Sequence, residues 1–366
     1  MAELRIEQLL REMVNRKASD LHLRVGVPPV YRINGTLQRL FDVRIDSAMM
    51  DSFLDDIMNR DQKQRFEANK ECDFAVGARD MGRFRVNVFR QRGTIAVVIR
   101  HIKAVIPAFE ELHLPEVIRD LALTKRGLVL VTGTTGSGKS TTLASMIDYI
   151  NQKESVNVIT VEDPIEYLYR DNVAIISQRE IGVDTLSYAN ALRAALRQDP
   201  DVLLVGEIRD LETMQIALTA ADTGHMVFAT IHTTNATETI HRVLSMYPPH
   251  QHDEVRLLLA EVLAGIISLR LLPTKDGKGR VPAAEILVNT GAIKEYIQDK
   301  NKIDMVEQAV AEGHIQYHSQ TFDQALLELY QNEQISLETA MNAATNRDDF
   351  DLKIRGISGT SDRGWM

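Results

Sequence analysis

A glycine-rich run of eight residues carries the clearest chemical signal in this sequence. It matches the phosphate-binding pattern G-x-x-x-x-G-K-[ST] at every required position. Glycines let backbone N–H groups approach phosphate oxygens, and the N-terminus of a following helix adds positive potential. In such a loop the lysine reaches the β- and γ-phosphates and the serine hydroxyl holds Mg²⁺. We therefore expect a nucleoside triphosphate and Mg²⁺ to bind at Gly133, Thr134, Thr135, Gly136, Ser137, Gly138, Lys139, Ser140 and Thr141.

The segments on either side of this loop have the patterns that it requires. Residues 128–132 form an apolar run, which is typical of a buried parallel strand. After the loop, apolar residues recur at helical spacing at Leu143, Met146, Ile147 and Ile150. The sequence therefore predicts a strand, the loop and a helix in that order.

Acidic residues follow two further apolar runs, where strands of a parallel sheet would end. Ligands of open α/β sheets bind beyond the carboxyl ends of the strands, so these positions favour a functional role. Glu207 comes after the run Val202–Val205 and is a candidate for the metal-side acid. Glu162, Asp163 and Glu166 follow the other run and are candidates for orienting an attacking water. Spacing alone does not choose among these three carboxylates.

Basic residues near the predicted strand ends complete the set of candidates. His225 comes before a predicted strand and His232 follows it, so only His232 is expected at the ligand edge, where it could sense a γ-phosphate. Arg193 and Arg197 are four residues apart on a predicted helix, and Arg209 closely follows the acid of the preceding strand. An arginine that reaches a neighbouring subunit's phosphates accelerates hydrolysis. Each of these arginines could equally form a surface ion pair.

Composition and charge exclude several classes of protein. The 366 residues are 44% hydrophobic and 25% charged, which is typical of a soluble globular chain of two or three domains. The formal charge of −9 provides no overall attraction for nucleic acid, so we expect no such partner. Cys72 is the only cysteine, which excludes a disulfide framework and a multi-cysteine zinc site and fits a reducing cytoplasm.

Hydropathy predicts no insertion into a membrane. The N-terminus is charged and lacks the apolar core of a signal peptide. The most apolar long stretch, residues 257–272, is too short to span a bilayer and contains Glu261 and Arg270. We interpret it as a buried or interface helix.

The pattern along the chain predicts an α+β region followed by an α/β region. In the first, a helix is expected at residues 6–14 and a tight turn at Asn34 and Gly35. A predicted strand at 83–89 is apolar on one face and cationic on the other. The predicted boundaries are 1–103 for the N-terminal domain, 104–115 for a linker, 116–272 for the α/β core, 273–355 for a mostly helical region and 356–366 for a disordered tail.

Four motifs in this order resemble those of the secretion-superfamily ATPases, and within them the type IV pilus retraction (twitching motility) ATPases of the PilT and PilU kinds. The motifs stand at residues 133–140 (Walker A), 160–167 (Asp box), 199–207 (Walker B) and 223–234 (His box). The resemblance runs from Ala18 to about Gly356. A Walker A pattern alone is shared by many nucleotide-binding proteins, whereas the ordered set of four is specific.

The resemblance implies an architecture and partners. It implies a RecA-like P-loop core with an N-terminal PAS-like α+β domain and C-terminal helices, assembled into a homohexameric ring with ATP and Mg²⁺ between the two domains. It also implies a cytoplasmic protein that docks at the inner membrane through a pilus platform protein. A paralogous retraction ATPase is a candidate further partner. The membrane contact would be indirect.

The resemblance also implies roles for individual residues. Arginines of the N-terminal domain close on the phosphates, and Arg85 and Arg100 are the matching positions. The catalytic glutamate corresponds to Glu166, and the Walker B metal-side residue to Glu207. His225 and His232 become His-box residues that couple the nucleotide state to the subunit interface.

The motifs leave the exact role open. A single cysteine excludes the tetracysteine zinc insertion of extension ATPases, which favours retraction over assembly. However, residues 291–298 keep only part of the Ala-Ile-Arg-Asn-Leu-Ile-Arg-Glu motif of retraction ATPases, and residues 319–326 resemble the accessory PilU-like paralogue. An accessory role is therefore an alternative, and a pilus-assembly or type II secretion ATPase is a more distant one.

Three functions of other classes share parts of this pattern. A nucleic-acid motor predicts ATPase stimulation by DNA or RNA with a steep salt dependence. A nucleotide-dependent scaffold predicts ATP binding without phosphate release. A small-molecule kinase predicts phosphate on an added acceptor. The acidic net charge disfavours the nucleic-acid motor. The complete set of acids disfavours the non-hydrolysing scaffold, and the N-terminal sheet and His box disfavour the kinase.

Overall fold

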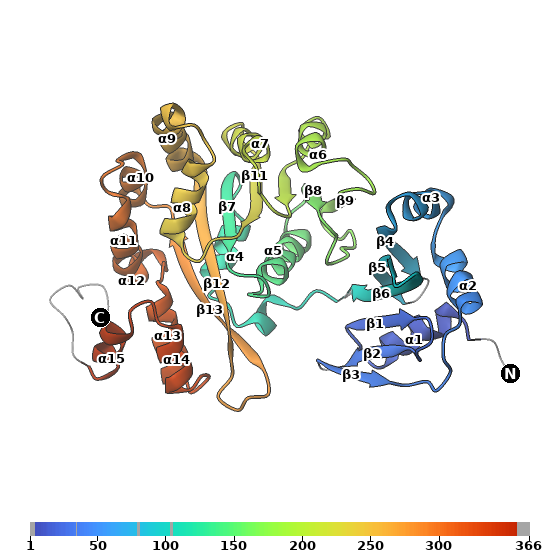
Figure 1. The fold of residues 1–366 in the computed structure, drawn as a ribbon. Coiled ribbons are helices and arrows are strands. Elements are labelled where there is room, and N and C mark those ends of the chain that lie inside the picture. Colours follow the sequence, from blue (N-terminus) through green and yellow to red (C-terminus); the bar gives the residue numbers. More distant parts are fainter. Residues whose placement is uncertain (1–3, 34, 79–80, 103–104, 357–366) are drawn as a thin grey trace. The chain divides into compact units, whose positions relative to one another are not determined.

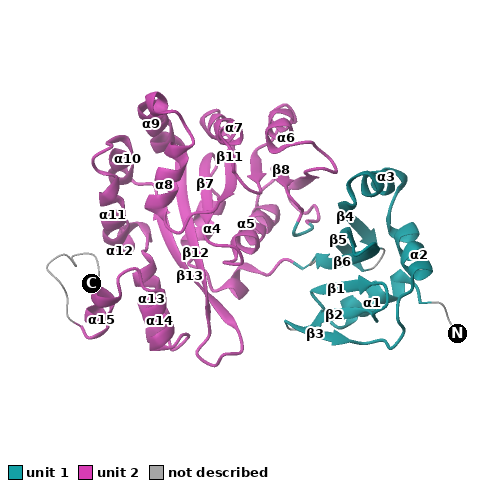
Figure 2. Cartoon of the chain, in the orientation of Figure 1, with its two compact units in different colours: residues 1–105, 166–168 teal, residues 106–165, 169–366 magenta. Residues whose placement is uncertain are grey.

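The computed structural model describes residues 4–33, 35–78, 81–102 and 105–356. The chain forms two compact units, residues 1–105 with 166–168, and residues 106–165 with 169–366 (Figure 2). Asn34 of the predicted turn and most of the predicted disordered tail, residues 357–366, lie outside the described residues. Each unit has its own hydrophobic core.

The first unit is built on a six-stranded antiparallel sheet in the order β3-β2-β1-β6-β5-β4 (Figure 1). In β5, Phe84, Val86 and Val88 are buried and alternate with part-exposed polar residues, as the pattern predicts. Helices pack on this apolar face through residues such as Leu9 and Phe53. The elements are α1 Ile6–Asn15, β1 Asp20–Arg24, β2 Val30–Ile33, β3 Thr36–Arg39, α2 Ser47–Ile57, α3 Arg60–Asn69, β4 Glu71–Ala78, β5 Gly82–Gln91 and β6 Thr94–Ile102.

The second unit is built on a seven-stranded sheet in the order β13-β12-β7-β11-β10-β8-β9. All neighbouring strands are parallel except β13, which pairs antiparallel with β12. This doubly wound arrangement is the one that the alternating pattern predicts, and it fits the RecA-like core that the resemblance implies. The strands are β7 Gly127–Thr132, β8 Asn157–Glu162, β9 Ile175–Glu180, β10 Val202–Val205, β11 Met226–Ile231, β12 Leu263–Pro273 and β13 Arg280–Val288.

Helices cover both faces of this sheet (Figure 1). Along β7, Leu128 and Leu130 pack in one core, while Val129 and Val131 pack in the other, together with α4 and α5. The helices are α4 Val117–Ala122, α5 Lys139–Lys153, α6 Tyr188–Ala195, α7 Leu211–Asp222, α8 Ala236–Ser245, α9 His252–Val262, α10 Gly291–Gln298, α11 Val306–Glu312, α12 His314–Tyr317, α13 Phe322–Gln331, α14 Leu337–Ala343 and α15 Arg347–Ile354, with 3-10 turns η1 Phe109–Leu112, η2 Pro249–Gln251 and η3 Ile303–Met305.

One prediction of secondary structure at the end of the core is wrong. The stretch 257–272 is part helix and part strand, because α9 ends at Val262 and β12 begins at Leu263. The region after residue 272 is mostly helical, as predicted, but it also contains the strand β13, which extends the sheet. Both strands are buried on two faces, so their residues do not alternate between apolar and polar, and an apolar run of this kind does not distinguish strand from helix.

The predicted linker is partly ordered. Residues 106–115 belong to the second unit, and Phe109 of η1 packs against the ring of Tyr149. Ser145 Oγ donates a 2.8 Å hydrogen bond to the carbonyl of Pro107. These contacts fasten the segment to α5.

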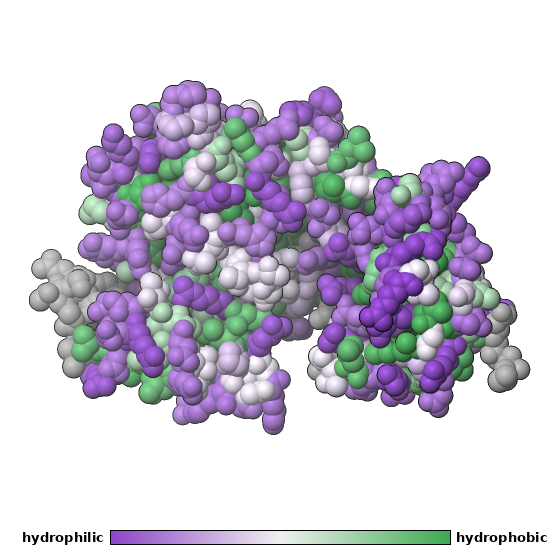
Figure 3. Space-filling view, viewed as in Figure 1, coloured by the Kyte–Doolittle hydropathy of each residue, from purple (hydrophilic) through white to green (hydrophobic). Residues whose placement is uncertain are grey.

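The surface shown in Figure 3 mixes hydrophilic and hydrophobic residues over both units. Within the described ranges, none of the helices combines the length and the apolar character needed to cross a bilayer.

Candidate active site

The glycine-rich loop joins β7 to α5 at the carboxyl edge of the parallel sheet. Gly133 has φ 138°, and a Cβ at this position would lie 2.4 Å from Ser137 Oγ and 2.5 Å from the carbonyl oxygen of Leu269. Only glycine fits there without displacing backbone. Gly138, the N-cap of α5, has no side chain to cap the helix, and the positive N-terminal end of α5 directly follows the loop, as in sites that bind anions.

Two polar groups of the loop are buried in ways that suit phosphate. Lys139 is 8% exposed, and its Nζ donates to the carbonyl oxygens of Gly133 at 2.8 Å and Thr134 at 3.0 Å. Ser137 Oγ is buried and has no hydrogen-bond partner among the described residues. Because buried polar groups are nearly always paired, this hydroxyl and the cradle at Gly133 fit a bound phosphate oxygen.

The acid after β10 forms the centre of a charge cluster. Glu207 Oε2 accepts a 2.5 Å hydrogen bond from Arg209 Nη2, and Oε1 lies 3.1 Å from His232 Nε2. Burial alone would raise the pKa of Glu207, but the hydrogen bond from Arg209 and the charges of His232, Arg209 and Lys139 hold this pKa below its usual value. The structure therefore brings the predicted metal-side acid, lysine and edge histidine together.

The three carboxylates after β8 have different surroundings. Glu162 is buried, and its Oε1 accepts hydrogen bonds from Thr160 Oγ1 at 2.7 Å and Gln178 Nε2 at 3.2 Å. Asp163 is exposed at the end of the strand. Glu166 is also exposed and belongs, with the two residues after it, to the first compact unit. Glu162 is thus buried and held in place by its neighbours, whereas Glu166 is an exposed residue.

Tyr188 is a site residue that sequence analysis missed. Its hydroxyl lies near the ends of β8 and β10, because a Cβ built on Gly206 would be 3.0 Å from it. Burial raises the pKa of Tyr188, and the charges of Asp163, Glu207 and Glu162 raise it further. In the sequence, Tyr188 is one of several residues at helical spacing and carries no signal of a role at the site. Its position as the first residue of the helix, next to the acids, is visible only in the fold.

Other predicted residues are not brought to the loop. His225 lies at the opposite end of β11, where its Nδ1 donates to the carbonyl of Ala220 at 2.9 Å. Arg193 forms an ion pair with Glu212 of α7. The prediction that Arg197 shares a helix with Arg193 is wrong, because α6 ends at Ala195.

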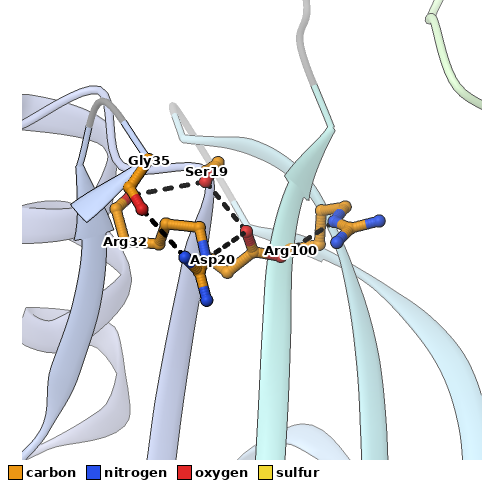
Figure 4. A network of polar contacts seen from close by, with 5 residues as sticks. All are labelled: Ser19, Asp20, Arg32, Gly35 and Arg100. Carbon is orange, nitrogen blue, oxygen red and sulfur yellow. Dashed lines mark hydrogen bonds and ion pairs between the residues drawn. The ribbon is translucent and has the colours of Figure 1, made fainter. Parts of the chain in front are cut away.

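Arg85 and Arg100 lie on the sheet of the first unit, directly opposite one another on β5 and β6. Arg100 Nε donates a 2.8 Å hydrogen bond to Asp20 Oδ1, and Ser19 Oγ donates to Asp20 Oδ2, also at 2.8 Å (Figure 4). Arg32 Nε is 3.9 Å from the same carboxylate. Opposed like charges are unfavourable, and the carboxylate of Asp20 offsets the charge of Arg100.

The geometry of the second unit defines a class of protein. A parallel sheet flanked by helices carries a phosphate-binding loop, a buried lysine and an acid on the neighbouring strand, and together these features define a P-loop ATPase.

Comparisons with known proteins identify the family. The model of the family described as type II/IV secretion system protein matches residues 1–353, and the chain belongs to this family. The chain is 41% identical over 352 residues to the type IV pilus ATPase PilU of Pseudomonas aeruginosa, covering 96% of this chain and 92% of PilU. It is 42% identical over 345 residues to the retraction ATPase PilT of the same organism, covering 94% of this chain and 99% of PilT.

A solved structure agrees with these comparisons. The crystal structure of the pilus retraction motor PilT with bound ADP superimposes with a TM-score of 0.89 and 46% identity, and covers 94% of this chain and 98% of that one. The expected resemblance and fold class are confirmed, and the chain is an ATPase that binds nucleotide.

Proposed function

We propose that this chain is a hexameric ATPase motor that powers type IV pilus retraction by hydrolysing ATP. The observation that carries the proposal is the loop itself: the charge of its buried Lys139 acts on Glu207, and its Ser137 hydroxyl is buried without a hydrogen-bond partner among the described residues. Similarity over nearly the whole chain to proteins named as a retraction ATPase and a retraction motor supports the mechanical role.

The loop residues bind and orient the triphosphate. Lys139 moves its ammonium from the loop carbonyls to the phosphates, and the first N–H groups of α5 donate to phosphate oxygens. Ser140 supplies a hydroxyl, and Glu207 a carboxylate, which are oxygen ligands of the kind Mg²⁺ prefers. Arg209 donates a hydrogen bond to one oxygen of Glu207 and His232 Nε2 lies 3.1 Å from the other, so we assign Glu207 to the metal through water. When bound, Mg²⁺ neutralises charge that develops on the phosphates.

A carboxylate must orient the attacking water, and we assign this role to Glu166. The buried Glu162 accepts hydrogen bonds from Thr160 and Gln178, which is typical of a residue with a structural role at the end of the strand. Glu166 is exposed, so a bound ligand can reach its side chain. Glu162 is the alternative base.

Cations from neighbouring copies would stabilise the transferring charge. The family resemblance gives this role to arginines of the N-terminal domain, so Arg85 and Arg100 are our candidates, and Arg100 would exchange its ion pair with Asp20 for the phosphates. Arg193 is paired with Glu212, and Arg209 would act within the subunit through Glu207. Head-to-tail contacts that close would form a ring. Its nucleotide-dependent changes would be transmitted to an inner-membrane pilus platform protein, at which this protein would dock from the cytoplasm.

The chemistry is tested with three variants in an ATPase assay with parallel ATP-binding measurements. Lys139→Ala should abolish binding or turnover. Glu166→Gln should bind ATP but lose turnover on the order of 100-fold or more. Glu162→Gln is the matched control and should lose less. Full turnover by Glu166→Gln would assign the water to Glu162 or to another group.

A second candidate is the accessory, PilU-like role, which the departures at residues 291–298 favour. Similarity to PilU is as extensive as similarity to PilT. The two roles are separated by expressing the chain in a strain that lacks every retraction ATPase and scoring pilus retraction. Rescue establishes the principal role, and rescue only beside a second retraction ATPase establishes the accessory one.

A further inference from the structure

Glu285 is a buried carboxyl group for which the chemistry above has no use. It lies on β13, is 6% exposed, and its Oε1 accepts a 2.6 Å hydrogen bond from the backbone N–H of Ala236. Ala236 is the first residue of α8. The short segment before it, which joins β11 to α8, begins with His232. A residue 49 positions away in the chain therefore holds the end of the segment that carries the site histidine.

This segment is tied to the first turn of α8 at several points. Thr233 Oγ1 lies 2.7 Å from Thr239 Oγ1, and both hydroxyls are buried. Thr234 donates to Glu238 Oε2 from its backbone N–H at 2.7 Å and from its hydroxyl at 2.6 Å. Asn235 caps the helix by accepting from the backbone of Glu238 at 2.8 Å. Residues 232–239 are thus expected to move together.

We propose that Glu285 is a positioning residue for the His232–Glu207 pair, acting by anchoring the first turn of α8 to β13. The inference rests on the proposed function, because it concerns the same ATP site. A carboxyl group suits this anchor, since it accepts from an N–H at the positive end of the helix. If the anchor is removed, His232 shifts relative to Glu207, while the phosphate loop on β7 and α5 is untouched.

The surroundings of Glu285 offer a matched control. Asp323 of α13 is also buried, and its Oδ1 accepts a 2.8 Å hydrogen bond from the backbone N–H of Thr345. It has the same kind of bond as Glu285, but it holds the C-terminal helices instead of the histidine segment. Glu285→Met and Asp323→Leu each remove one carboxyl acceptor while keeping a side chain of nearly the same number of non-hydrogen atoms. Glu285→Gln keeps an acceptor oxygen.

The experiment measures steady-state ATPase kinetics together with hydrogen–deuterium exchange of peptides covering residues 231–240 without nucleotide. Glu285→Met should lower kcat on the order of tenfold with little change in KM for ATP, and should speed exchange in this segment. Glu285→Gln should recover most of both, and Asp323→Leu should keep the kcat of the unmodified chain.

Three results would overturn the positioning role. The first is unchanged kcat or unchanged exchange in Glu285→Met, and the second is an equal loss of kcat in Asp323→Leu. The third concerns a further variant, which is used if Glu285→Met does not fold. Thr239→Val removes the hydrogen bond to Thr233 while leaving Glu285 in place. Full kcat in Thr239→Val would overturn the proposal, and reduced kcat would support it. If the unmodified chain fails to hydrolyse ATP, the proposed function fails, and the exchange measurement still decides whether Glu285 anchors the segment.

Discussion

Substituting Glu285 by glutamine should change how stability depends on pH. Burial raises the pKa of Glu285 from 4.5 to about 7, and the hydrogen bond from Ala236 only partly opposes this. Between these pH values the folded chain keeps a proton that the unfolded chain releases. Stability of the unmodified chain therefore falls as pH rises from about 4.5 to about 7, and this contribution levels off above pH 7.

The size of the effect follows from the two pKa values. The difference between 4.5 and about 7 corresponds to about 3 kcal/mol, because each pH unit is worth about 1.36 kcal/mol. Glutamine is neutral and keeps the acceptor for Ala236, so the variant lacks this pH-dependent loss. Three charged groups act on the carboxyl: Glu307 and Asp323 raise its pKa, and Arg270 lowers it. All three groups are present in both chains, so their interactions with the rest of the protein cancel when the two free energies of unfolding are subtracted.

The assay is denaturant unfolding of both chains at a series of pH values from 4.5 to 7.5. The free energy of unfolding of Glu285→Gln should rise relative to that of the unmodified chain by up to about 3 kcal/mol across this range. Parallel pH curves for the two chains would refute the reasoning, because they would mean that Glu285 has the same pKa folded and unfolded.

Three further substitutions test other parts of the structure. Gly133→Ala should abolish ATP binding in calorimetry and lower the free energy of unfolding by about 1–3 kcal/mol, because the added Cβ would clash with backbone. Normal ATP binding by this variant would contradict the prediction. Asp20→Asn should cost about 1 kcal/mol of stability to chemical unfolding, because its arginine partner is largely exposed, and a loss above about 3 kcal/mol would show a stronger network. Arg209→Ala should raise the pKa of Glu207 and move the acidic limb of the kcat–pH profile to higher pH, and an unmoved limb would exclude their coupling.

Local patterns were sufficient for much of the fold and the loop. The strands beside the loop, the helix after it and the alternation in β5 were predicted from residue spacing, because each depends on contacts along one segment. The short edge strand β9 and the strands β12 and β13 were missed. β12 and β13 are buried on both faces, so the signal that separates strand from helix is absent from the sequence.

The sequence by itself determined that a triphosphate site exists and which residues belong to its loop, because the phosphate-binding pattern is contiguous and its geometry is set by glycines. It also determined that Glu207 and His232 follow strands. Only the tertiary structure decided that these two side chains contact each other, that the Tyr188 hydroxyl lies beside the acids, and that Glu285 accepts a hydrogen bond from the start of α8. Such contacts join residues that are far apart in the chain, and they depend on strand order and register, which residue spacing does not encode.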